Sequence, residues 1–413
     1  MKVIALTPEL FDKYSMNYPN TSYYQTSKYG NVMQNFDYYV QYIGIIDDTK
    51  TLVGATMILY RTVFMNYKEA YAPRGILLNY EKTDLLQEAI EVLKKALKKQ
   101  NIMVLKMDPY IPISIRDKKG TRLNVNTKAN LIMANLQSTG FNYLGKTKQF
   151  EGEKPRWEAM TTINRDLREI YASFDKRTRH KIRKALNSGV QVYKDPQKST
   201  RALFGFIKYK HHEVASYYRH LIDSFGDATD VYYAKINTEI FVVNSRRLYE
   251  REMAKNDAMS REIQNPELDT KEKNKLLNKK MDSDRLLNVY KNSLVRATDL
   301  LKKYPNGMII AGALTLCYNN TVYIITEGYN TEYGYLNAGY LIKWNIINDF
   351  NKKEYQYLNL NAVIGLFNKK TQYSGLNEMK AGFNAVFMEY IGEFELITNN
   401  FAYNLNNKFN KDK

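Results

Sequence analysis

The longest helical pattern in this chain lies between Thr238 and Lys303 and reads TEIFVVNSRRLYEREMAKNDAMSREIQNPELDTKEKNKLLNKKMDSDRLLNVYKNSLVRATDLLKK. It holds no glycine and a single proline, Pro266, which breaks the pattern into two arms. Apolar residues in the second arm recur at alternating steps of three and four, like a coiled-coil seam, at Leu287, Tyr290, Leu294, Ala297 and Leu301. We therefore expect an antiparallel helical hairpin, used either as a solvated spacer or as a contact surface for a partner.

The segments on either side of the hairpin repeat one order of elements: two strand-like runs, a helix and a buried strand. In the first segment these are predicted at 38–46, 52–61, 84–99 and 102–107. In the second segment they are predicted at 307–317, 321–326, 336–350 and 355–360. Each copy then continues through a second helical stretch into Gly-Phe-Asn, at 140–142 and 382–384. This order is typical of an acyltransferase domain of the GNAT type.

The predicted fold is therefore mixed α/β (α+β), with two tandem GNAT-like domains and an inserted antiparallel coiled-coil hairpin. The first domain is expected at residues 1–154. The second domain is expected at 155–237 and 304–413, and the hairpin insertion at 238–303. We expect the apolar residues of the hairpin to be used mostly on its own seam, so that the hairpin contributes little to the core.

The composition sets limits on the class of protein. With 413 residues, 44% of them hydrophobic, the chain is long enough for two or three packed domains. Its one cysteine, Cys317, excludes a disulfide within the chain and a cysteine-built metal site. The four histidines lack metal-ligand spacing, so no metal is expected. The longest apolar run, 308–318, is too short to cross a membrane, and we expect no secretory leader because residues 1–10 hold no long apolar run. We expect a cytoplasmic protein.

A formal charge of +18 indicates a polyanionic partner, such as nucleic acid, an anionic membrane face or a phosphorylated substrate. Half of this excess falls between residues 155 and 220, which hold 15 Lys or Arg against 6 Asp or Glu. The densest segment, 176–184, has six basic residues and no acid. An apolar stripe on one helix is predicted from Ile170, Phe174, Ile182 and Leu186. The outward side is then either a solvated basic face or an anion contact formed by Arg177, Arg179, Lys181 and Arg183.

Several short segments occur in a characteristic order along the whole chain. They are Tyr24-Gln25-Thr26, Arg74-Gly75, Asp108-Pro109-Tyr110, Asn187-Ser188-Gly189-Val190, the helical insert and Lys380-Ala381-Gly382-Phe383. In this order the chain resembles the Fem family of peptidoglycan branch-peptide aminoacyltransferases. The resemblance implies transfer of an amino acid from aminoacyl-tRNA to a side-chain amine of the stem peptide, on lipid II or its nucleotide-linked form, to build the interpeptide bridge. Aminoacyl-tRNA is then a donor substrate and no cofactor is expected.

The resemblance also implies roles for single residues. Lys380 matches a family lysine that stabilises the oxyanion formed on the aminoacyl ester, although an ordinary surface lysine is the alternative. Asp108 matches an acidic position whose role is to hold or deprotonate the attacking ammonium, and a turn-capping aspartate before Pro109 is the alternative. Further candidates for substrate contacts are Arg74, Tyr71, Tyr110, Glu327, Tyr340 and Asn361. The hairpin is a candidate tRNA contact.

One position departs from the family pattern. Many relatives carry a lysine for the acceptor diphosphate where this chain has Met33, so either Lys28 substitutes or arginines elsewhere hold the phosphates. A lipid-linked acceptor would bring the protein to the inner face of the membrane as a peripheral contact. The resemblance also admits a homodimer or a heterodimer with a paralogue.

Two other functions remain in competition. An acetyl-CoA-dependent GNAT N-acetyltransferase would need a loop of the form Arg/Gln-x-x-Gly-x-Gly/Ala at a helix N-terminus. The nearest stretch here, 332–339, has Glu332 where the basic or amide residue belongs. A non-catalytic RNA-binding protein could use the basic segment and the hairpin without any chemistry.

Overall fold

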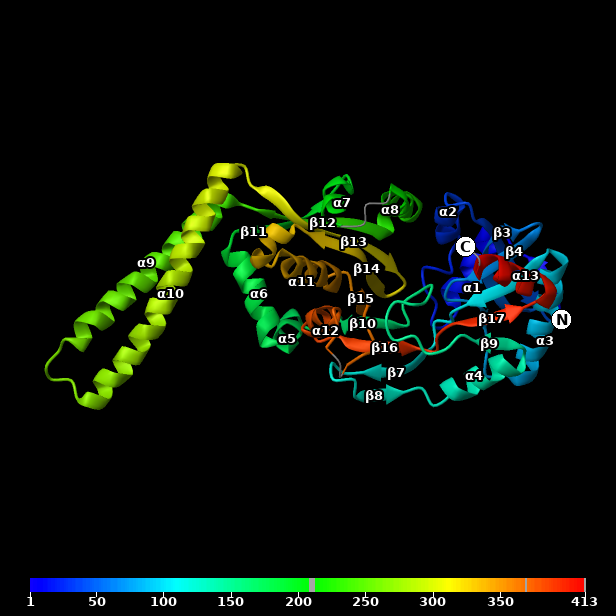
Figure 1. Ribbon diagram of the computed structural model, residues 1–413. Helices are drawn as coiled ribbons and strands as arrows, with labels where there is room; N and C mark the ends of the chain where they lie inside the picture. The colour runs from blue at the N-terminus through cyan, green and yellow to red at the C-terminus, as the bar shows by residue number, and fades with distance from the viewer. Residues whose placement is uncertain (208–211, 368–369, 412–413) are drawn as a thin grey trace.

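The computed structural model describes residues 1–207, 212–367 and 370–411, which form two mixed β-sheets with helices around them (Figure 1). The first sheet has the order β1 (Lys2–Ala5), β2 (Tyr39–Ile46), β3 (Leu52–Phe64), β4 (Tyr67–Ala72), β6 (Ile102–Met107), β17 (Phe394–Ile397) and β9 (Phe141–Tyr143), and β5 (Leu77–Leu78) pairs with β3. The second sheet has the order β11 (Val190–Asp195), β12 (Thr229–Ile236), β13 (Met308–Tyr318), β14 (Thr321–Tyr329), β15 (Tyr357–Ala362), β10 (Trp157–Thr162), β16 (Val386–Tyr390), β7 (Pro112–Arg116) and β8 (Arg122–Val125).

The two sheets repeat one topology. Read from β1 to β9 and from β11 to β16, they have matching strands in the same order. In each, a parallel pair, β4 with β6 and β14 with β15, is joined by a crossover helix, α3 (Thr83–Lys99) or α11 (Ala338–Asn351). A second helix, α4 (Ala129–Ser138) or α12 (Ser374–Ala381), follows in each copy. The mixed α/β fold and the duplication predicted from the sequence are therefore confirmed.

Strand exchange between the two halves was not predicted. The C-terminal strand β17 pairs with β6 and β9 in the first sheet, whereas β7 and β8 from the N-terminal part extend the second sheet beside β16. Figure 1 shows β17 running from the second sheet back into the first. The proposed domain boundaries at residues 154, 237 and 304 stay a prediction, because strands from each side of residue 154 complete both sheets.

Amphipathic helices close the cores as their sequences predict. Helix α3 buries Leu86, Ile90, Leu93 and Leu97 under the first sheet. Helix α11 buries Leu341, Ile342, Ile346 and Ile347 under the second. The remaining helices are α1 (Pro8–Asn17), α2 (Ser27–Gln34), α5 (Leu167–Ser173), α6 (Lys176–Asn187), α7 (Arg201–Phe206), α8 (His212–Phe225), α13 (Asn400–Lys411) and the short 3-10 turns η1 (Gly226–Ala228) and η2 (Thr331–Leu336).

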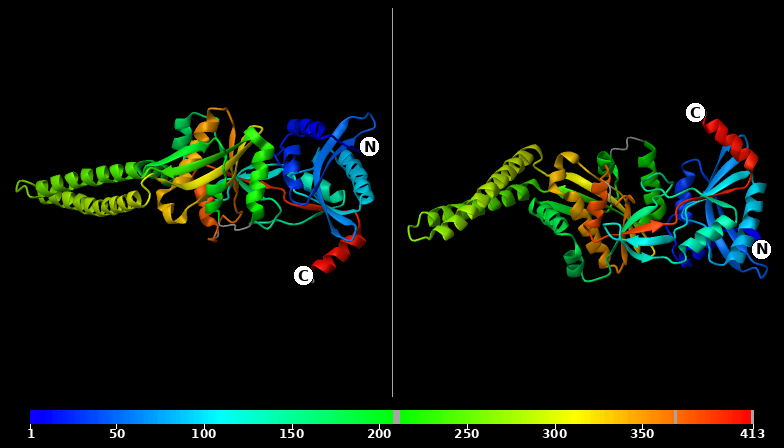
Figure 2. Two further views of the ribbon diagram at one scale, coloured as in Figure 1. Left: turned by 90° about the horizontal axis from the view of Figure 1, so that it is seen from above. Right: turned by 60° about the horizontal axis from the view of Figure 1, so that its bottom comes forward.

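The helical hairpin is present and consists of α9 (Thr238–Ile263) and α10 (Thr270–Lys303), with Pro266 in the connection. Ser245 Oγ lies 3.1 Å from Ser293 Oγ, and Ser283 Oγ donates to Glu252 Oε1 at 2.7 Å, so the helices run antiparallel. Figure 2 shows them projecting away from both sheets, at the opposite end of the molecule from α13. Supercoiling of the pair stays a prediction.

The expectation that the hairpin uses its apolar residues on its own seam is wrong for its base. Phe241, Val242, Ala297 and Leu300 are buried in the core of the second sheet. Farther out, the two helices meet through the polar contacts of Glu252 with Ser283 and of Asn256 with Asp284. The base of the hairpin is therefore part of the core, because its apolar side chains belong to the same buried cluster as residues of α6 and β12.

Candidate functional site

The second sheet opens between two of its central strands. The parallel strands β14 and β15 pair only over Thr321–Tyr323 and Tyr357–Asn359, although both continue beyond these residues. Their counterparts β4 and β6 pair over Lys68–Ala72 and Ile102–Met107. The opening therefore belongs to the second copy of the repeat, where backbone groups that would pair in a closed sheet need other partners.

Asn361 holds the opening apart. Its Nδ2 donates hydrogen bonds to the carbonyl oxygens of Ile324 at 3.2 Å and Ile325 at 3.1 Å. Its φ is +69°, a region that asparagine adopts more readily than most residues. The pairing of β14 with β13 also shifts register at Ile325. The Asn361 side chain thus satisfies β14 carbonyls that a neighbouring strand would otherwise bond, and the two strands stay separated.

A cavity of about 900 Å³ lies beside the part of β14 that no longer pairs with β15. It is lined by the ends of β13 and β14, by η2, by the N-terminal part of α11, by one side of α12 and by Lys181 of α6. Three of the predicted site residues line it together: Lys181, Glu327 and Tyr340. Lys181 Nζ donates to Tyr340 Oη at 2.7 Å, and the Tyr340 ring stacks on Phe383 with 5.7 Å between centroids.

Lys380 lies in the last turn of α12, next to Met379 of the cavity wall, and is 4% exposed. Its Nζ donates to the carbonyl oxygen of Ala362, at the end of β15, at 2.6 Å. Burial lowers the pKa of Lys380 to about 7, and the nearby carboxylate of Glu327 acts in the opposite direction. The alternative of an ordinary surface lysine is therefore wrong. A titratable ammonium at the parting of two strands is a group that can donate to, or exchange a proton with, a bound carbonyl.

A second lysine, Lys343 of α11, forms an ion pair with Glu327 of β14 in the wall of the cavity. Its side chain is buried, whereas Glu327 is partly exposed. The Lys343 charge disfavours the protonated form of Lys380 and the Glu327 charge favours it, which places all three groups in one electrostatic unit. Lys343 was not predicted from the sequence, although a single lysine within the apolar helix Ala338–Ile347 is a visible signal.

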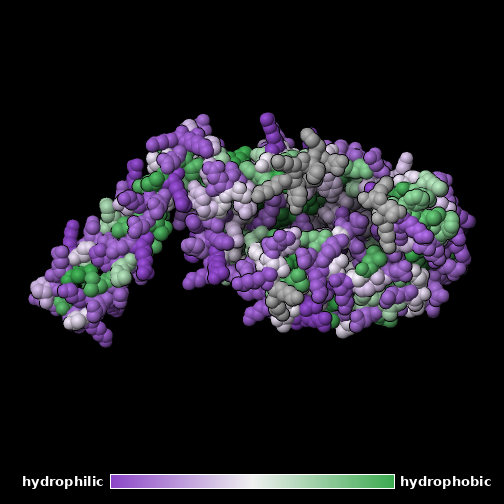
Figure 3. Space-filling view, viewed as in Figure 1, coloured by the Kyte–Doolittle hydropathy of each residue, from purple (hydrophilic) through white to green (hydrophobic). Residues whose placement is uncertain are grey.

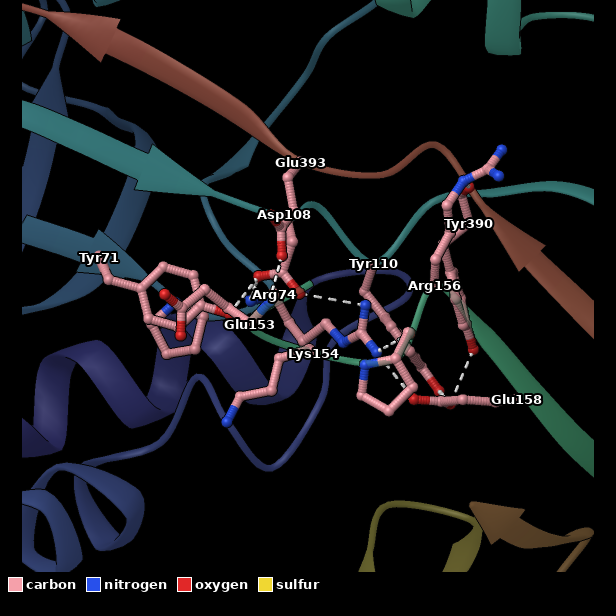
Figure 4. A network of polar contacts seen from close by, with 12 residues as sticks. Tyr71, Arg74, Asp108, Tyr110, Glu153, Lys154, Arg156, Glu158, Tyr390 and Glu393 are labelled. Atoms are coloured by element: carbon pink, nitrogen blue, oxygen red, sulfur yellow. Dashed lines mark hydrogen bonds and ion pairs between the residues drawn. The ribbon is translucent and has the colours of Figure 1, made fainter. Parts of the chain in front are cut away.

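A separate polar network joins the two sheets around Arg74, which is 2% exposed (Figure 4). Its Nη1 lies 3.2 Å from Asp108 Oδ2, and its Nη2 lies 2.8 Å from Glu158 Oε1. Asp108 Oδ1 accepts from the backbone N–H of Arg74 and from Tyr71 Oη, each at 2.8 Å. Burial raises the pKa of Asp108, while the Arg74 charge acts in the opposite direction. The turn-capping alternative for Asp108 is wrong, because its backbone partner lies 34 positions earlier in the chain.

Glu158 of β10 is the acceptor at the centre of this network. Its Oε2 accepts from Asn359 Nδ2 at 2.8 Å, from Tyr390 Oη at 3.1 Å and from Tyr110 Oη at 3.2 Å. The Arg74 guanidinium also lies over the rings of Tyr110 and Tyr390, at 5.2 and 4.9 Å from their centroids. Glu158 and Tyr390 were not predicted from the sequence. A lone acid inside the strand Trp157–Thr162 was the available signal for Glu158.

The structure does not bring the two predicted catalytic side chains together. Among the described residues, Asp108 contacts Tyr71 and Arg74, whereas Lys380 donates to Ala362. Glu158 lies between them, since it pairs with Arg74 and its charge favours the protonated form of Lys380. Asn361, predicted to touch substrate, instead bonds β14 carbonyls. The substrate roles of Tyr71, Arg74 and Tyr110 stay predictions, as do those of Glu327, Tyr340 and Asn361.

The basic segment forms two helices, α5 and α6, rather than the single helix expected from the sequence. The chain turns at Phe174 and Asp175, so Leu186 leaves the predicted apolar stripe and is exposed, while Ile170 and Ile182 stay buried. Arg177 and Arg183 are exposed as predicted. Arg179 instead bonds the carbonyl oxygens of Ala172 and Phe174 at the end of α5. Lys181 turns towards the 900 Å³ cavity.

A groove of about 650 Å³ continues from that cavity along α6 and α12 and shares Lys181 and Tyr340 with it. Four cations line the groove: Lys118, Arg177, Lys181 and Lys370. Two acids, Asp175 and Glu378, line it as well, and Asp175 forms an ion pair of 3.0 Å with Lys118. The remaining positive charge can attract an anionic ligand towards the cavity.

A cation does lie near the position where Met33 departs from the family pattern. Met33 packs partly buried against the core, and Lys28 points at the ring of Phe225, 6.0 Å away. Lys154 Nζ lies 3.3 Å from the Oη of Tyr29, one helical turn before Met33, and 4.3 Å from the centroid of Tyr24. No pattern in the sequence points to Lys154 as a candidate site residue.

Two further expectations concern metal ions and membrane-spanning helices. Within residues 1–207, 212–367 and 370–411, no group of three or more His, Cys, Asp or Glu side chains is placed to bind a metal ion. His211 lies outside these residues. Helices long and apolar enough to cross a membrane are also absent from the described part of the chain.

Known proteins resemble this chain over nearly its full length. It is 21% identical to the "Lipid II:glycine glycyltransferase" of Staphylococcus haemolyticus over 417 residues, covering 98% of this chain and 95% of that protein. It is 22% identical to "Aminoacyltransferase FemA" of Staphylococcus epidermidis over 375 residues, covering 88% of each. The structure of FemX superposes with a TM-score of 0.72 at 19% identity, covering 98% of this chain and 99% of that one, which shows a shared fold.

The family model gives the most direct assignment. The model described as "FemAB family" matches residues 6–411, which include the second sheet, all of the first sheet except β1, the hairpin and the 900 Å³ cavity beside β14. The resemblance inferred from short segments of sequence is therefore confirmed: this chain belongs to the FemAB family.

Proposed function

We propose that this protein transfers an aminoacyl group from aminoacyl-tRNA to a side-chain amine of the peptidoglycan stem peptide, on lipid II or its nucleotide-linked form. Relatives named as a lipid II:glycine glycyltransferase and as the aminoacyltransferase FemA support a transferase that builds the peptide bridge. The observation that carries the proposal for this chain is the buried Lys380 ammonium, which donates to Ala362 at the end of β15 and adjoins Met379 in the wall of the 900 Å³ cavity.

In the proposed reaction the acceptor amine attacks the ester carbonyl of the donor. A carbon–nitrogen bond forms, and the carbonyl oxygen becomes an oxyanion that Lys380 Nζ stabilises by donating a hydrogen bond. Collapse of the tetrahedral intermediate breaks the ester carbon–oxygen bond, and the proton lost by the amine ends on the leaving ribose oxygen. The Ala362 carbonyl and the Glu327–Lys343 ion pair hold the Lys380 ammonium in position before the substrates bind.

The donor enters along the basic groove in this proposal. Its phosphates would meet Arg177, Lys181 and Lys370, and its aminoacyl end would reach the cavity past Tyr340. Phosphate contacts of this kind make affinity depend on salt. In this proposal the net charge of +18 favours the binding of two polyanionic substrates.

The acceptor occupies the junction between the sheets. Cavities of about 460 and 810 Å³ lie there and share Tyr110 as a wall residue. Arg74, with its charge offset by Asp108 and Glu158, serves to fix this wall rather than to bind a phosphate. Asp108 acts in the same arrangement as a positioning residue, because its Oδ1 accepts from Tyr71 and the Arg74 backbone and its Oδ2 faces the Arg74 guanidinium.

The test is single-turnover transfer from charged tRNA, beginning with glycyl-tRNA, to a lipid-linked stem peptide. Lys380→Met should lower the rate by about 100–1000-fold while the affinities for tRNA and acceptor change much less, because the oxyanion does not exist in the ground state. Lys302→Met, at an exposed position of α10, is the matched control. A variant within about threefold of the wild-type rate would exclude the oxyanion role. Transfer from acetyl-CoA, with none from charged tRNA, would overturn the proposed function.

A further inference from the structure

The C-terminal helix α13 packs against the protein with its polar side. Ala402 and Asn406 are buried against the first sheet, and Asn406 Nδ2 donates to Glu69 Oε1 at 3.1 Å. Tyr403 Oη donates to Glu395 at 3.0 Å. These contacts fix which face of the helix turns inward, and that face is small and polar rather than apolar.

Two large aromatic side chains of α13, Phe401 and Phe409, point outward, and Leu405 between them is half-buried. Phe401, Leu405 and Phe409 recur at steps of four, which places them on one face of the helix. Phe401 is 72% exposed and Phe409 is 56% exposed. This arrangement reverses the usual amphipathic pattern, in which the apolar stripe faces the core. A soluble surface gains nothing from it, so the stripe points to a contact outside the chain.

The turn between β3 and β4 extends this apolar surface. The ring of Phe64 stacks on Phe409 with 5.1 Å between centroids, and the adjacent Met65 is 80% exposed. Figure 3 shows hydrophobic surface near α13, at the end of the body away from the hairpin. We call this set the α13 patch: Phe64, Met65, Phe401, Leu405 and Phe409.

The charged residues of helix α13 are all positive. Between Asn399 and Lys411 the chain has two lysines and no acid. Lys408 is exposed beside Phe409. The two nearby acids, Glu69 and Glu395, accept hydrogen bonds from the inward side of the helix. An apolar stripe flanked by lysine is the combination that binds an anionic membrane interface.

We propose that the α13 patch docks this protein on the anionic face of a lipid membrane, with the aromatic side chains inserted between headgroups. A second copy of the chain fits less well, because a stable interface uses roughly 20–30 residues a side and this patch is one short helix and one turn. The proposal rests on the proposed function in one respect: a lipid-linked acceptor lies in such a membrane.

The test uses the full-length protein with vesicles containing phosphatidylglycerol, compared with vesicles of phosphatidylcholine alone. Wild type should float with the anionic vesicles. The double variant Phe401→Ser/Phe409→Ser should reduce partitioning by about tenfold or more, and Lys408→Gln should weaken the preference for anionic lipid and its salt dependence. Leu10→Ser/Met16→Ser removes two exposed apolar side chains of α1 and is the matched control.

Further measurements separate the outcomes. The thermal midpoint of the double variant should equal that of the control, and its transfer to a water-soluble nucleotide-linked acceptor should be unchanged. Unchanged vesicle binding by the double variant would overturn the proposal, as would a change from dimer to monomer by light scattering without any vesicle binding. If wild type binds vesicles but transfers nothing to either acceptor, the proposed function fails while the docking surface stands.

Discussion

Arg74 and Glu158 join the two halves of the chain through a buried ion pair, with Arg74 Nη2 2.8 Å from Glu158 Oε1. Arg74 follows β4 of the first sheet, and Glu158 lies on β10 of the second. Each group has further partners, Asp108 for Arg74 and Tyr110, Asn359 and Tyr390 for Glu158. Burying these charges costs desolvation free energy. Removing either partner destabilises the protein, because the other charge is then left buried without its partner.

Glu158→Gln should therefore destabilise the protein by roughly 3–5 kcal/mol. Glutamine keeps the shape of the side chain but removes the charge that offsets Arg74. The measurement is the free energy of unfolding from urea denaturation. The control is Glu91→Gln, which breaks the exposed 2.6 Å pair of Glu91 with Lys95 and should leave the free energy of unfolding almost unchanged. Equal losses in the two variants would show that the buried pair contributes no more than a surface one.

Local pattern was enough to predict most elements of the fold. The hairpin, the amphipathic helix at 84–99 and the repeated strand order each depend on periodicity within a short window. The exchange of β17 into the first sheet depends on pairing between Phe394–Ile397 and Ile102–Met107, which no local pattern records. The turn at Phe174 and Asp175 was missed for a related reason, since the helical spacing of Ile170, Phe174, Ile182 and Leu186 continues across it without a break.

The candidate site was predicted only where a residue type stood out. Lys380 was selected by family resemblance, but its burial and its Ala362 contact depend on the path of β15. Glu158 and Lys343 are charges within otherwise apolar elements, and this signal was present but unused. Lys154 became visible only when folding placed it beside Tyr29. Ionisable groups whose partners come from distant segments are the part of the site that sequence alone does not supply.

The lowered pKa of Lys380, about 7, predicts a specific dependence of stability on pH. Between pH 7 and 10.5 the unfolded chain holds a proton on Lys380 that the folded protein has lost. The free energy of unfolding contributed by this group therefore rises as pH increases across that window. Relative to Lys380→Met, wild type should gain up to about 1.4 kcal/mol per pH unit between pH 7 and 9. A pH-independent difference between the two proteins would show that Lys380 titrates at an ordinary pKa.

Asn361 should control the opening between β14 and β15. Asn361→Ala removes both hydrogen bonds to Ile324 and Ile325 and also disfavours the φ of +69°. Asn361→Gly removes the bonds but tolerates that conformation. Both should lose about 1–3 kcal/mol for the unsatisfied carbonyls, with a further loss for alanine, and both should raise the KM for donor. If Asn361→Gly matches wild type in stability and KM, the side-chain amide has no part in holding the strands apart.

The arginines of the basic segment carry the same charge, but their roles should differ according to where each side chain lies. Arg177 and Arg183 are exposed, whereas Arg179 bonds the last carbonyls of α5. Arg177→Gln/Arg183→Gln should weaken tRNA binding and lower the slope of log affinity against log salt by very roughly 0.7–0.9 for each phosphate that no longer meets a cation, with little change in stability.

Arg179→Gln should instead lower the thermal midpoint, because it leaves the end of α5 without its side-chain partner. The control, Lys98→Gln/Lys99→Gln, removes two exposed cations of α3 on the first sheet. A salt slope that falls equally in the control and in the Arg177 and Arg183 variant would mean that tRNA responds to net charge and not to this surface.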